Sequence, residues 1–474
     1  MNKNSASLTE GPIARTLVTF TLPILFGNIL QSVNGSVNSI WVGRFLGEAA
    51  LSATANANSI MFLLVGGVFG VSMAATILIA QYIGAGKPGE ARRVVGTSAT
   101  FFALLSVAIS LAGWVFAPEL LTGMRTPPEA TPFALAYLRI IFVAIPFIYL
   151  YTFVMAVMRG AGDSATPFRF LLLSVGLDIV LNPLFIFGWG PVPRLGIAGS
   201  ALATLVANAV SLTALVWFLY RRQDALCLRG AELRYLRLDG SLVGALLRKG
   251  LPIGLQIVVI SANAVMLISL VNRYGTDTTA AYGAAWQLWN YLQMPAFSIG
   301  AAVSSMAAQN VGAHRWDRVH RVARTGVAFH CAVTGTLVLL LVLVNKHALG
   351  LFLVPGPALD IAGHINATSA WSFIFFGVSM VLFGVVRSTG AVVPPLLVLF
   401  VALWCVRIPI AVGFAPRFGA DAIWWSFPIA SALSAVLALA YYRFGGWRRA
   451  RMIPVAAKST AGSDAGTPTP GEAA

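Results

Sequence analysis

One acidic residue stands where it could carry out proton or ion chemistry. Of the 16 acidic residues, only Asp178 lies near the middle of an apolar segment long enough to cross a membrane. Hydrocarbon penalises the charged form of a carboxyl, so we expect Asp178 to bind and release a proton at physiological pH. Asn182 lies one helical turn further on, on the same face. A carboxylate beside amides could instead bind Na⁺, and a neutral Asp held for packing is the structural alternative.

Amide side chains form a second group of candidate residues. In the first apolar segment four amides recur every three or four residues and therefore share one helical face: Asn28, Gln31, Asn34 and Asn38. Polar groups in hydrocarbon need partners or water, so this stripe favours a cavity wall, although hydrogen bonds between helices would also use such amides. We predict that Asn34 and Asn38 support ion coupling at Asp178, and that Gln31 lines a substrate cavity.

Polar and aromatic residues in the second half of the chain complete the predicted substrate cavity. Two apolar segments contribute them: Gln256, Asn263, Trp286, Gln287 and Asn290. Aromatic faces hold a flat organic cation by stacking and cation–π contacts, and amides supply hydrogen bonds. The predicted ligand is therefore a small organic molecule.

The elements that must position these residues are membrane-spanning helices. The 474 residues are 58% apolar and only 10% charged, whereas soluble domains carry about 25% charged residues. A spanning helix needs about 20 predominantly apolar residues. Twelve segments meet this requirement: 17–42, 52–80, 94–116, 133–158, 168–188, 196–220, 250–272, 279–306, 325–344, 367–386, 393–414 and 422–442.

The distribution of positive charge predicts the orientation of these segments. The formal net charge is +16, and 24 of the 32 Lys and Arg residues fall on the N-terminal side of the predicted membrane. Seven lie on the other side, and the remaining one, Arg407, lies well inside a segment. Short loops rich in Lys and Arg stay in the cytoplasm, so we expect both termini to be cytoplasmic.

An internal repeat divides the chain into two halves. At a shift of about 228 residues, QYIGAGKPGEARRVV from Gln81 matches QNVGAHRWDRVHRVA from Gln309, and RGAGDSATP from Arg159 matches RSTGAVVPP from Arg387. Six spans per half is an even number, so the halves are related by an axis along the membrane normal, with the substrate path between them. We predict a six-helix lobe over 1–220, a basic cytoplasmic linker over 221–249, a second lobe over 250–444 and a disordered cytoplasmic tail over 445–474.

Other function classes lack their motifs in this sequence. There is no HExxH, GxSxG or Walker A motif, and the three cysteines are far apart, so neither an enzyme nor a nucleotide-driven pump is indicated. The positive charges are scattered between apolar segments, which argues against nucleic acid as a partner. We expect no cofactor beyond a coupling ion, H⁺ or Na⁺, and a monomer surrounded by membrane lipids.

Five segments resemble the multidrug and toxic compound extrusion family. They are LTEGPIARTLVTFTLPILFGNILQSVNGSVNSIWVGRFLG from Leu8, QYIGAGKPGEARR from Gln81, MRGAGDSATP from Met158, DIVLNPLFIFGWG from Asp178 and VRIPIA from Val406. The resemblance covers nearly the whole chain. It implies an all-α membrane protein with twelve helices in two six-helix lobes, located in the bacterial cytoplasmic membrane, that exchanges Na⁺ or H⁺ for mostly cationic organic compounds.

The sequence departs from the family pattern at the positions that bind ions. Some members have an acid in span one where Asn38 stands, and an Asn followed by an Asp where Asp178 and Asn182 stand. Another branch has carboxylates in spans seven and ten, and this sequence has none there. These departures concentrate coupling on Asp178. They favour a proton-coupled exporter of organic cations or drugs; a flippase of lipid-linked sugars, or an exporter of a specific metabolite on the same fold, is the alternative.

Overall fold

The computed structural model describes residues 8–124, 126–188 and 193–452, and these residues form helices and no strand. Six long helices make up the first lobe: α1 (Ile13–Leu46), α2 (Glu48–Gly84), α3 (Pro88–Gly123), α4 (Thr131–Gly160), α5 (Ala165–Phe187) and α6 (Ile197–Arg221). Each is rich in apolar residues over at least one membrane-length stretch. The predicted all-α membrane fold is therefore confirmed.

The second lobe repeats this plan with more interruptions. Its elements are α7 (Gly240–Val271), α8 (Thr276–Gly312), α9 (Trp316–Leu343), α10 (Asn345–Leu349), α11 (Pro357–Ser369), α12 (Ser372–Arg387), α13 (Val393–Phe400), α14 (Ile408–Gly413), α15 (Ala415–Phe418) and α16 (Asp421–Phe444). Between α13 and α14 the chain forms a π-helical segment, η3 (Val401–Arg407). Such wide helical turns are rare and often occur at functional sites.

The predicted number of spans agrees with these helices once two irregular ones are counted. Ten helices in the described residues are long and apolar enough to cross a membrane, and α11 with α12 forms an eleventh span bent by 43°. With 37 residues, α8 is long enough to be the twelfth, although it is not among the ten most apolar helices. The helices run beyond the apolar segments that the sequence predicts, because helical hydrogen bonding continues past the hydrocarbon.

The linker between the two lobes is structured. α7 begins at Gly240, ten residues before the predicted start of the second lobe, and Asp239 caps it by accepting hydrogen bonds from the Ser241 and Leu242 amides. The linker also holds a short 3₁₀ helix, η1 (Gly230–Leu236), and its Glu232 pairs with Arg92 of α3. The linker is therefore fastened to the first lobe.

The prediction of a disordered tail from residue 445 is wrong for its first eight residues. Trp447 is buried, stacks on Tyr442 with ring centroids 5.3 Å apart, and packs edge-on against Trp316. Its backbone oxygen accepts a hydrogen bond from Thr389 Oγ1. The apolar area of the indole outweighs the polar composition that follows it. Residues 453–474 lie outside the described residues.

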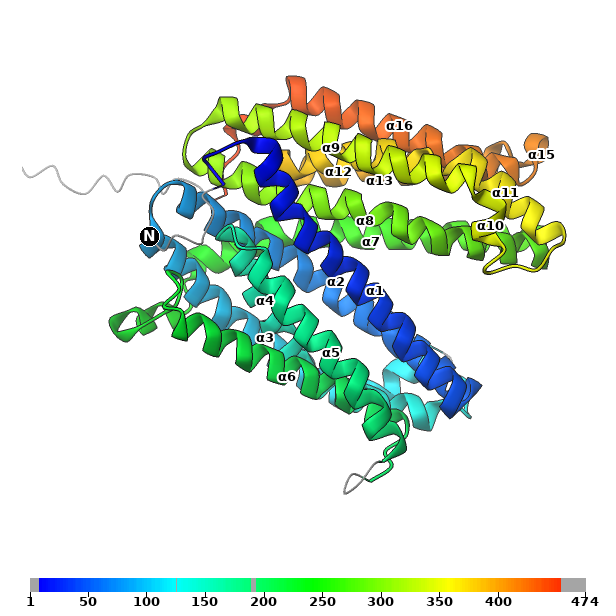
Figure 1. Cartoon of the computed structure of the whole chain (residues 1–474), viewed down its shortest axis with the longest axis horizontal. Helices are drawn as coiled ribbons and strands as arrows, with labels where there is room; N and C mark the ends of the chain where they lie inside the picture. Colours follow the sequence, from blue (N-terminus) through cyan, green and yellow to red (C-terminus); the bar gives the residue numbers. More distant parts are fainter. Residues whose placement is uncertain (1–7, 125, 189–192, 453–474) are drawn as a thin grey trace, which may run out of the picture.

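The helices of the two lobes meet at one end of the molecule and diverge toward the other. In Figure 1 the N-terminal segment, the linker and the end of α16 lie at the end where the lobes converge, while α10 and α15 lie at the opposite end. α1 runs obliquely between the lobes (Figure 1) and packs against both α5 and α8. A helix in this position is in contact with both halves of the molecule.

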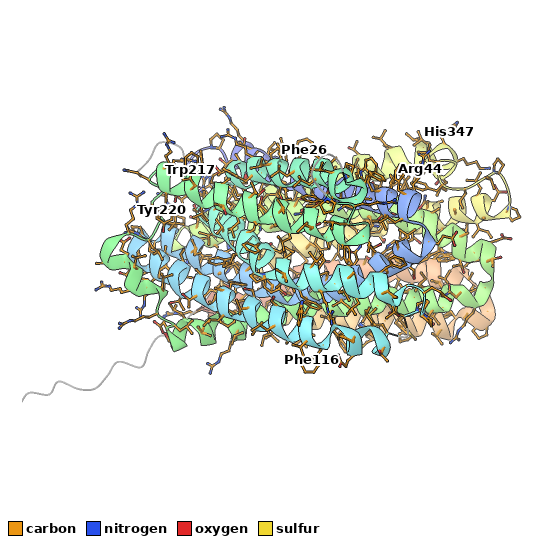
Figure 2. The ribbon with its side chains drawn as sticks, turned by 90° about the horizontal axis from the view of Figure 1, so that it is seen from below. Phe26, Arg44, Phe116, Trp217, Tyr220 and His347 are labelled. Carbon is orange, nitrogen blue, oxygen red and sulfur yellow. The ribbon has the colours of Figure 1, made fainter. Side chains whose placement is uncertain are left out.

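Large apolar side chains cover the outside of the bundle. Phe26, Phe116 and Trp217 are more than half exposed, and Figure 2 shows them projecting outward from the helices. Monomeric soluble proteins rarely expose apolar surface of this extent. Arg44 and His347 both lie toward one end of the molecule, and Tyr220 lies toward the other (Figure 2). This surface is suited to contact with lipid chains between two polar ends.

Candidate functional site

A hydrogen-bond network surrounds Asp178 on α5, which is buried in the first lobe. Oδ2 accepts from Asn34 Nδ2 at 2.8 Å and from Asn38 Nδ2 at 2.9 Å, both on α1. Oδ1 accepts from Thr204 Oγ1 of α6 at 3.1 Å. Both oxygens of the carboxylate are therefore bonded to side chains of neighbouring helices. The structure therefore brings together the predicted coupling residues and adds Thr204, which the sequence analysis did not identify.

Asn182 joins this network through α1. Its Nδ2 donates to Asn38 Oδ1 at 2.9 Å and to the backbone oxygen of Asp178 at 3.0 Å. The four-residue spacing places Asn182 one turn beyond Asp178, and Pro183 inside α5 removes a backbone donor from that turn. All four predicted coupling residues thus form one connected group. We call Asp178, Asn182, Asn34, Asn38 and Thr204 the carboxylate cluster.

Two oxygen atoms of the carboxylate cluster have no partner. Asn34 Oδ1 and Asn182 Oδ1 are fully buried and accept no hydrogen bond. A buried acceptor without a donor costs about 1–3 kcal/mol. The cluster can therefore accept one more donor or bind a cation through oxygen. No group of three His, Cys, Asp or Glu side chains that could hold a metal occurs in the described residues, so any cation bound here would rely on amide and hydroxyl oxygens beside the single carboxylate.

The same face of α1 connects the carboxylate cluster to the second lobe. Asn28 Nδ2, six residues before Asn34, donates to Ser298 Oγ of α8 at 2.9 Å. The stripe predicted from the sequence therefore has two functions: its C-terminal part binds Asp178 and its N-terminal part binds the opposite lobe. Gln31, between them, is exposed. One helix is thus hydrogen-bonded both to Asp178 and to the second lobe.

The second lobe contains a counterpart of the carboxylate cluster with the opposite charge. Arg407 lies at the end of η3, 229 residues after Asp178, and its Nη1 donates to Asn263 Oδ1 of α7 at 3.3 Å. Asn263 is also 229 residues after Asn34. The Nη2 donates to Ser431 Oγ of α16 at 3.5 Å, as Thr204 of α6 bonds Asp178. We call Arg407, Asn263 and Ser431 the guanidinium cluster.

A small cavity of about 50 Å³ adjoins the guanidinium cluster. Asn263 and Trp286, both predicted substrate-cavity residues, line it together with Arg407. Phe427 lies beneath the Arg407 guanidinium, 4.3 Å from it to the ring centroid. The cavity has amide, hydroxyl and aromatic walls, as the sequence analysis expects for a substrate pocket, but its single charge is positive.

The remaining predicted cavity residues lie elsewhere. Gln256 is buried, donates to the Val392 backbone oxygen at 3.4 Å, and accepts from Arg387 at 3.3 Å. These bonds fasten α7 to the end of α12. Gln287 is exposed and Asn290 is partly exposed on α8. The sequence shows that these residues are polar, but it does not show which of them share a pocket.

Paired glutamines hold the two lobes together at the end where they converge. Gln81 of α2 donates to the Ser388 backbone oxygen at 2.6 Å, and Gln309 of α8 donates to the Gly160 backbone oxygen at 3.0 Å. Each bond crosses from one lobe to the other, and the two are equivalent under the 228-residue repeat. The repeat in the sequence contained this signal, but the sequence analysis used it only to divide the lobes.

Two glycines allow this close contact. A Cβ at Gly84 would collide with the Gln309 backbone oxygen, and a Cβ at Gly312 would collide with the Gln81 backbone oxygen. These glycines are also equivalent under the repeat. We call Gln81, Gly84, Gln309 and Gly312 the lobe contact. A larger residue at either glycine would push α2 and α8 apart.

These observations define a multi-pass membrane protein with two repeated lobes, a buried ionisable site and a close contact between the lobes at one end. The MatE family model matches residues 23–184 and 252–412, one match in each lobe. The chain therefore belongs to the MatE family, whose members are transporters and not enzymes. Both the predicted family and the predicted absence of an enzyme are confirmed.

Individual relatives extend over almost the whole chain. It is 36% identical over 432 residues to the probable multidrug resistance protein YoeA of Bacillus subtilis (strain 168), covering 91% of this chain and 93% of YoeA. It is 31% identical over 445 residues to YpnP of the same strain, another probable multidrug resistance protein, covering 94% and 98%. A crystal structure of MATE in the straight conformation has a TM-score of 0.86 at 20% identity, covering 94% and 98% of the two chains.

Proposed function

We propose that this protein is a proton-coupled antiporter that exports organic cations and drugs across the cytoplasmic membrane. The observation that carries the proposal is the carboxylate cluster, in which the only acid mid-membrane in the sequence is bound by α1, α5 and α6. The multidrug resistance relatives support export of drugs. We further propose that the protein works as a monomer among membrane lipids, with both termini in the cytoplasm.

The hydrogen bonds of Asp178 suggest how a proton would act. The ionised carboxylate accepts from Asn34, Asn38 and Thr204. A protonated carboxyl becomes a donor and needs an acceptor, and the unpaired oxygens of Asn34 and Asn182 are the available ones. Rotation of the Asn34 side-chain amide by half a turn would point its oxygen at Asp178 in place of its NH₂ group. The cluster thus has two self-consistent hydrogen-bond arrangements, one for each protonation state.

α1 would carry this change to the rest of the protein. Asn34 and Asn38 hold α1 to α5, while Asn28 holds the same helix to Ser298 of α8. Pro23 interrupts the backbone hydrogen bonding of α1 and provides a bending point near its cytoplasmic end. Proton binding can shift α1 between two positions only by as much as the proton-binding free energy differs between those positions. Proton uptake would therefore shift the balance between two arrangements of the lobes.

Transport driven by one ion gradient at a time tests this proposal. The purified protein is reconstituted into liposomes, a pH gradient or a Na⁺ gradient is imposed separately, and movement of a fluorescent organic cation is followed. We expect the pH gradient to drive transport and Asp178→Asn to reduce this transport by about tenfold or more. Transport driven equally well by Na⁺ at constant pH would assign Na⁺ to the carboxylate cluster instead. Full proton-driven transport by Asp178→Asn would contradict the proposal.

A matched control separates loss of coupling from general damage. Asp360 at the start of α11 is an exposed carboxylate, 3.3 Å from Lys346 Nζ at the opposite end of the molecule from the termini. Asp360→Asn makes the same chemical change outside the membrane interior. We expect this variant to keep proton-driven transport. Equal losses in both variants would show that the assay reports folding rather than coupling.

A further inference from the structure

The charge of Arg407 has no counter-ion within the protein. None of the ion pairs among the described residues includes Arg407, and the cavity lining contains no acidic side chain. A guanidinium stays protonated in proteins, so it cannot become neutral as a buried acid or amine can. Arg407 is only partly exposed, and a cation within a membrane-spanning segment is costly when no anion accompanies it. The guanidinium cluster therefore contains an uncompensated positive charge.

The hydrogen bonds of Arg407 also leave donors unused. A guanidinium has five N–H donors, and the two bonds it makes, at 3.3 Å and 3.5 Å, are long. Its Nε is buried and has no partner. Phe427 covers one face of the guanidinium and stabilises the cation in part, but a ring face accepts none of the in-plane N–H bonds. The N–H donors in the plane of the guanidinium are therefore available to a planar or spherical anion.

The adjoining cavity has the size and lining for such an anion. A cavity of about 50 Å³ has room for roughly three to five water-sized groups. Asn263, Gln293 and Ser431 contribute polar groups, while Trp286 and Phe376 contribute apolar walls. A carboxylate or a halide would fit this space, and a large multiply charged headgroup would not. The apolar walls would also accommodate the part of an organic molecule that carries a carboxylate.

We propose that the guanidinium cluster is a binding site for a monovalent anionic group, held by Arg407 and partly enclosed by aromatic side chains. The anion is either an inorganic halide or the carboxylate of an organic solute, and both sources present the same chemistry to the guanidinium. Arg with a carboxylate forms short, charge-assisted and often bidentate hydrogen bonds. This inference is independent of proton coupling at Asp178, because it rests on the other lobe.

Binding of simple anions to the reconstituted protein tests this site. Intrinsic tryptophan fluorescence is followed while bromide replaces gluconate at constant ionic strength, because bromide quenches indoles that it contacts and Trp286 lines the cavity. Benzoate and its neutral analogue benzamide are then added as competitors. We expect saturable quenching by bromide, competition by benzoate and no competition by benzamide. Competition by benzoate assigns the site to organic carboxylates as well as halides, whereas bromide binding without competition assigns it to inorganic anions.

Variants at position 407 link the signal to the proposed residue. Arg407→Gln should weaken anion binding by about tenfold or more, and Arg407→Lys, which keeps the charge but loses the fork, by a smaller factor. Arg139→Gln is the matched control, because Arg139 also lies over an indole, Trp114, at 5.0 Å, but in the first lobe. Absence of saturable binding in the unmodified protein would overturn the proposal. So would unchanged binding in both Arg407 variants.

Discussion

The two lobes place a charge at the same position of a repeated fold, and the charges are opposite. In the first lobe Asp178 is bound by amides of α1 and a hydroxyl of α6. In the second lobe Arg407 is bound by an amide of α7 and a hydroxyl of α16. An acid can lose its charge by taking up a proton, whereas a guanidinium keeps its charge. The repeat thus places a charged residue at the same position in both lobes, but only the residue of the first lobe can change its charge.

The lobe contact differs from these clusters because it keeps the same residues in both lobes. Gln81 and Gln309 make equivalent hydrogen bonds, and Gly84 and Gly312 make equivalent close approaches. Closing two lobes against each other needs matching surfaces, so both copies retain the same residues. Ion coupling needs only one titratable site, so the two charged positions were free to differ. The repeat therefore keeps the contact between the lobes the same and varies the charge inside each lobe.

The largest effect is expected from charge removal in the first lobe. Asp178→Asn should reduce proton-driven transport by about tenfold or more, because the sequence has no second acid mid-membrane to replace it. Initial rates in proteoliposomes at several imposed pH gradients measure this. A rate that still rises with the pH gradient in the variant would show that another group carries the proton.

Equal effects in the two lobes are expected at the lobe contact. Gly84→Ala and Gly312→Ala each insert a methyl group against backbone oxygen, and overpacking of this kind costs about 1–3 kcal/mol. The population with the lobes closed at this end should fall by about one to two powers of ten in each variant. Labelling of a cysteine introduced at the convergent end, from the cytoplasmic side, measures the opening.

Gly89→Ala is the matched control for these two variants, because a Cβ there meets no atom within 4 Å. Its labelling should equal that of the parent protein. Strong labelling in only one of the Gly84 and Gly312 variants would contradict the symmetry of the lobe contact.

A smaller effect is expected from the hydroxyl that binds Asp178. Thr204→Val removes one hydrogen bond to the ionised carboxylate, worth about 1.5–3 kcal/mol. The carboxylate is then held by fewer partners, so proton-driven transport should fall, though by less than in Asp178→Asn, and initial rates in proteoliposomes measure this. Thr213→Val on the same helix is the control, because the Thr213 hydroxyl bonds only to the Ala209 backbone oxygen. Unchanged transport in Thr204→Val, or equal losses in both variants, would contradict the assignment of Thr204.

The smallest effect is expected at the joint between the lobes. Hydrogen bonds from Ser241 hold the pKa of Asp239 below its usual value, and Arg93 also pairs with this carboxylate. Asp239→Ala should lower the free energy of unfolding by about 1 kcal/mol at neutral pH through loss of the helix cap. Because the pKa of Asp239 is lower in the folded protein, its ionised carboxylate stabilises the folded state at pH values above the usual carboxyl pKa. This contribution is lost as the pH falls through the lowered pKa. Thermal unfolding at neutral and acidic pH measures the difference, which should disappear in acid.

Much of this fold could be predicted from the sequence, because apolar runs and the repeat report directly on membrane spans. The sequence analysis predicted a span within α8 despite the polar residues of this helix. The structured start of the tail was missed, because the burial of Trp447 depends on Trp316 and Tyr442, far away in the sequence. Local composition does not encode such contacts.

The candidate site was predictable on α1 and α5 but not beyond them. Asn34, Asn38 and Asn182 were predicted because they share helical faces with the one mid-membrane acid. Thr204 and Ser431 were not, because a hydroxyl in an apolar segment is common and only packing between helices shows which one meets a charge. The unpaired Arg407 Nε could be recognised only with all its neighbours in place.

Infrared difference spectroscopy of the reconstituted protein tests the central claim, that Asp178 is the group that takes up the proton. Spectra recorded between about pH 5 and 8 avoid the range in which exposed carboxyls, with pKa values of about 4, titrate. We predict that acidification in this range produces the C=O stretching band of a protonated carboxyl in the parent protein and in Asp360→Asn, and that Asp178→Asn lacks it. The same band at full intensity in Asp178→Asn would contradict the account.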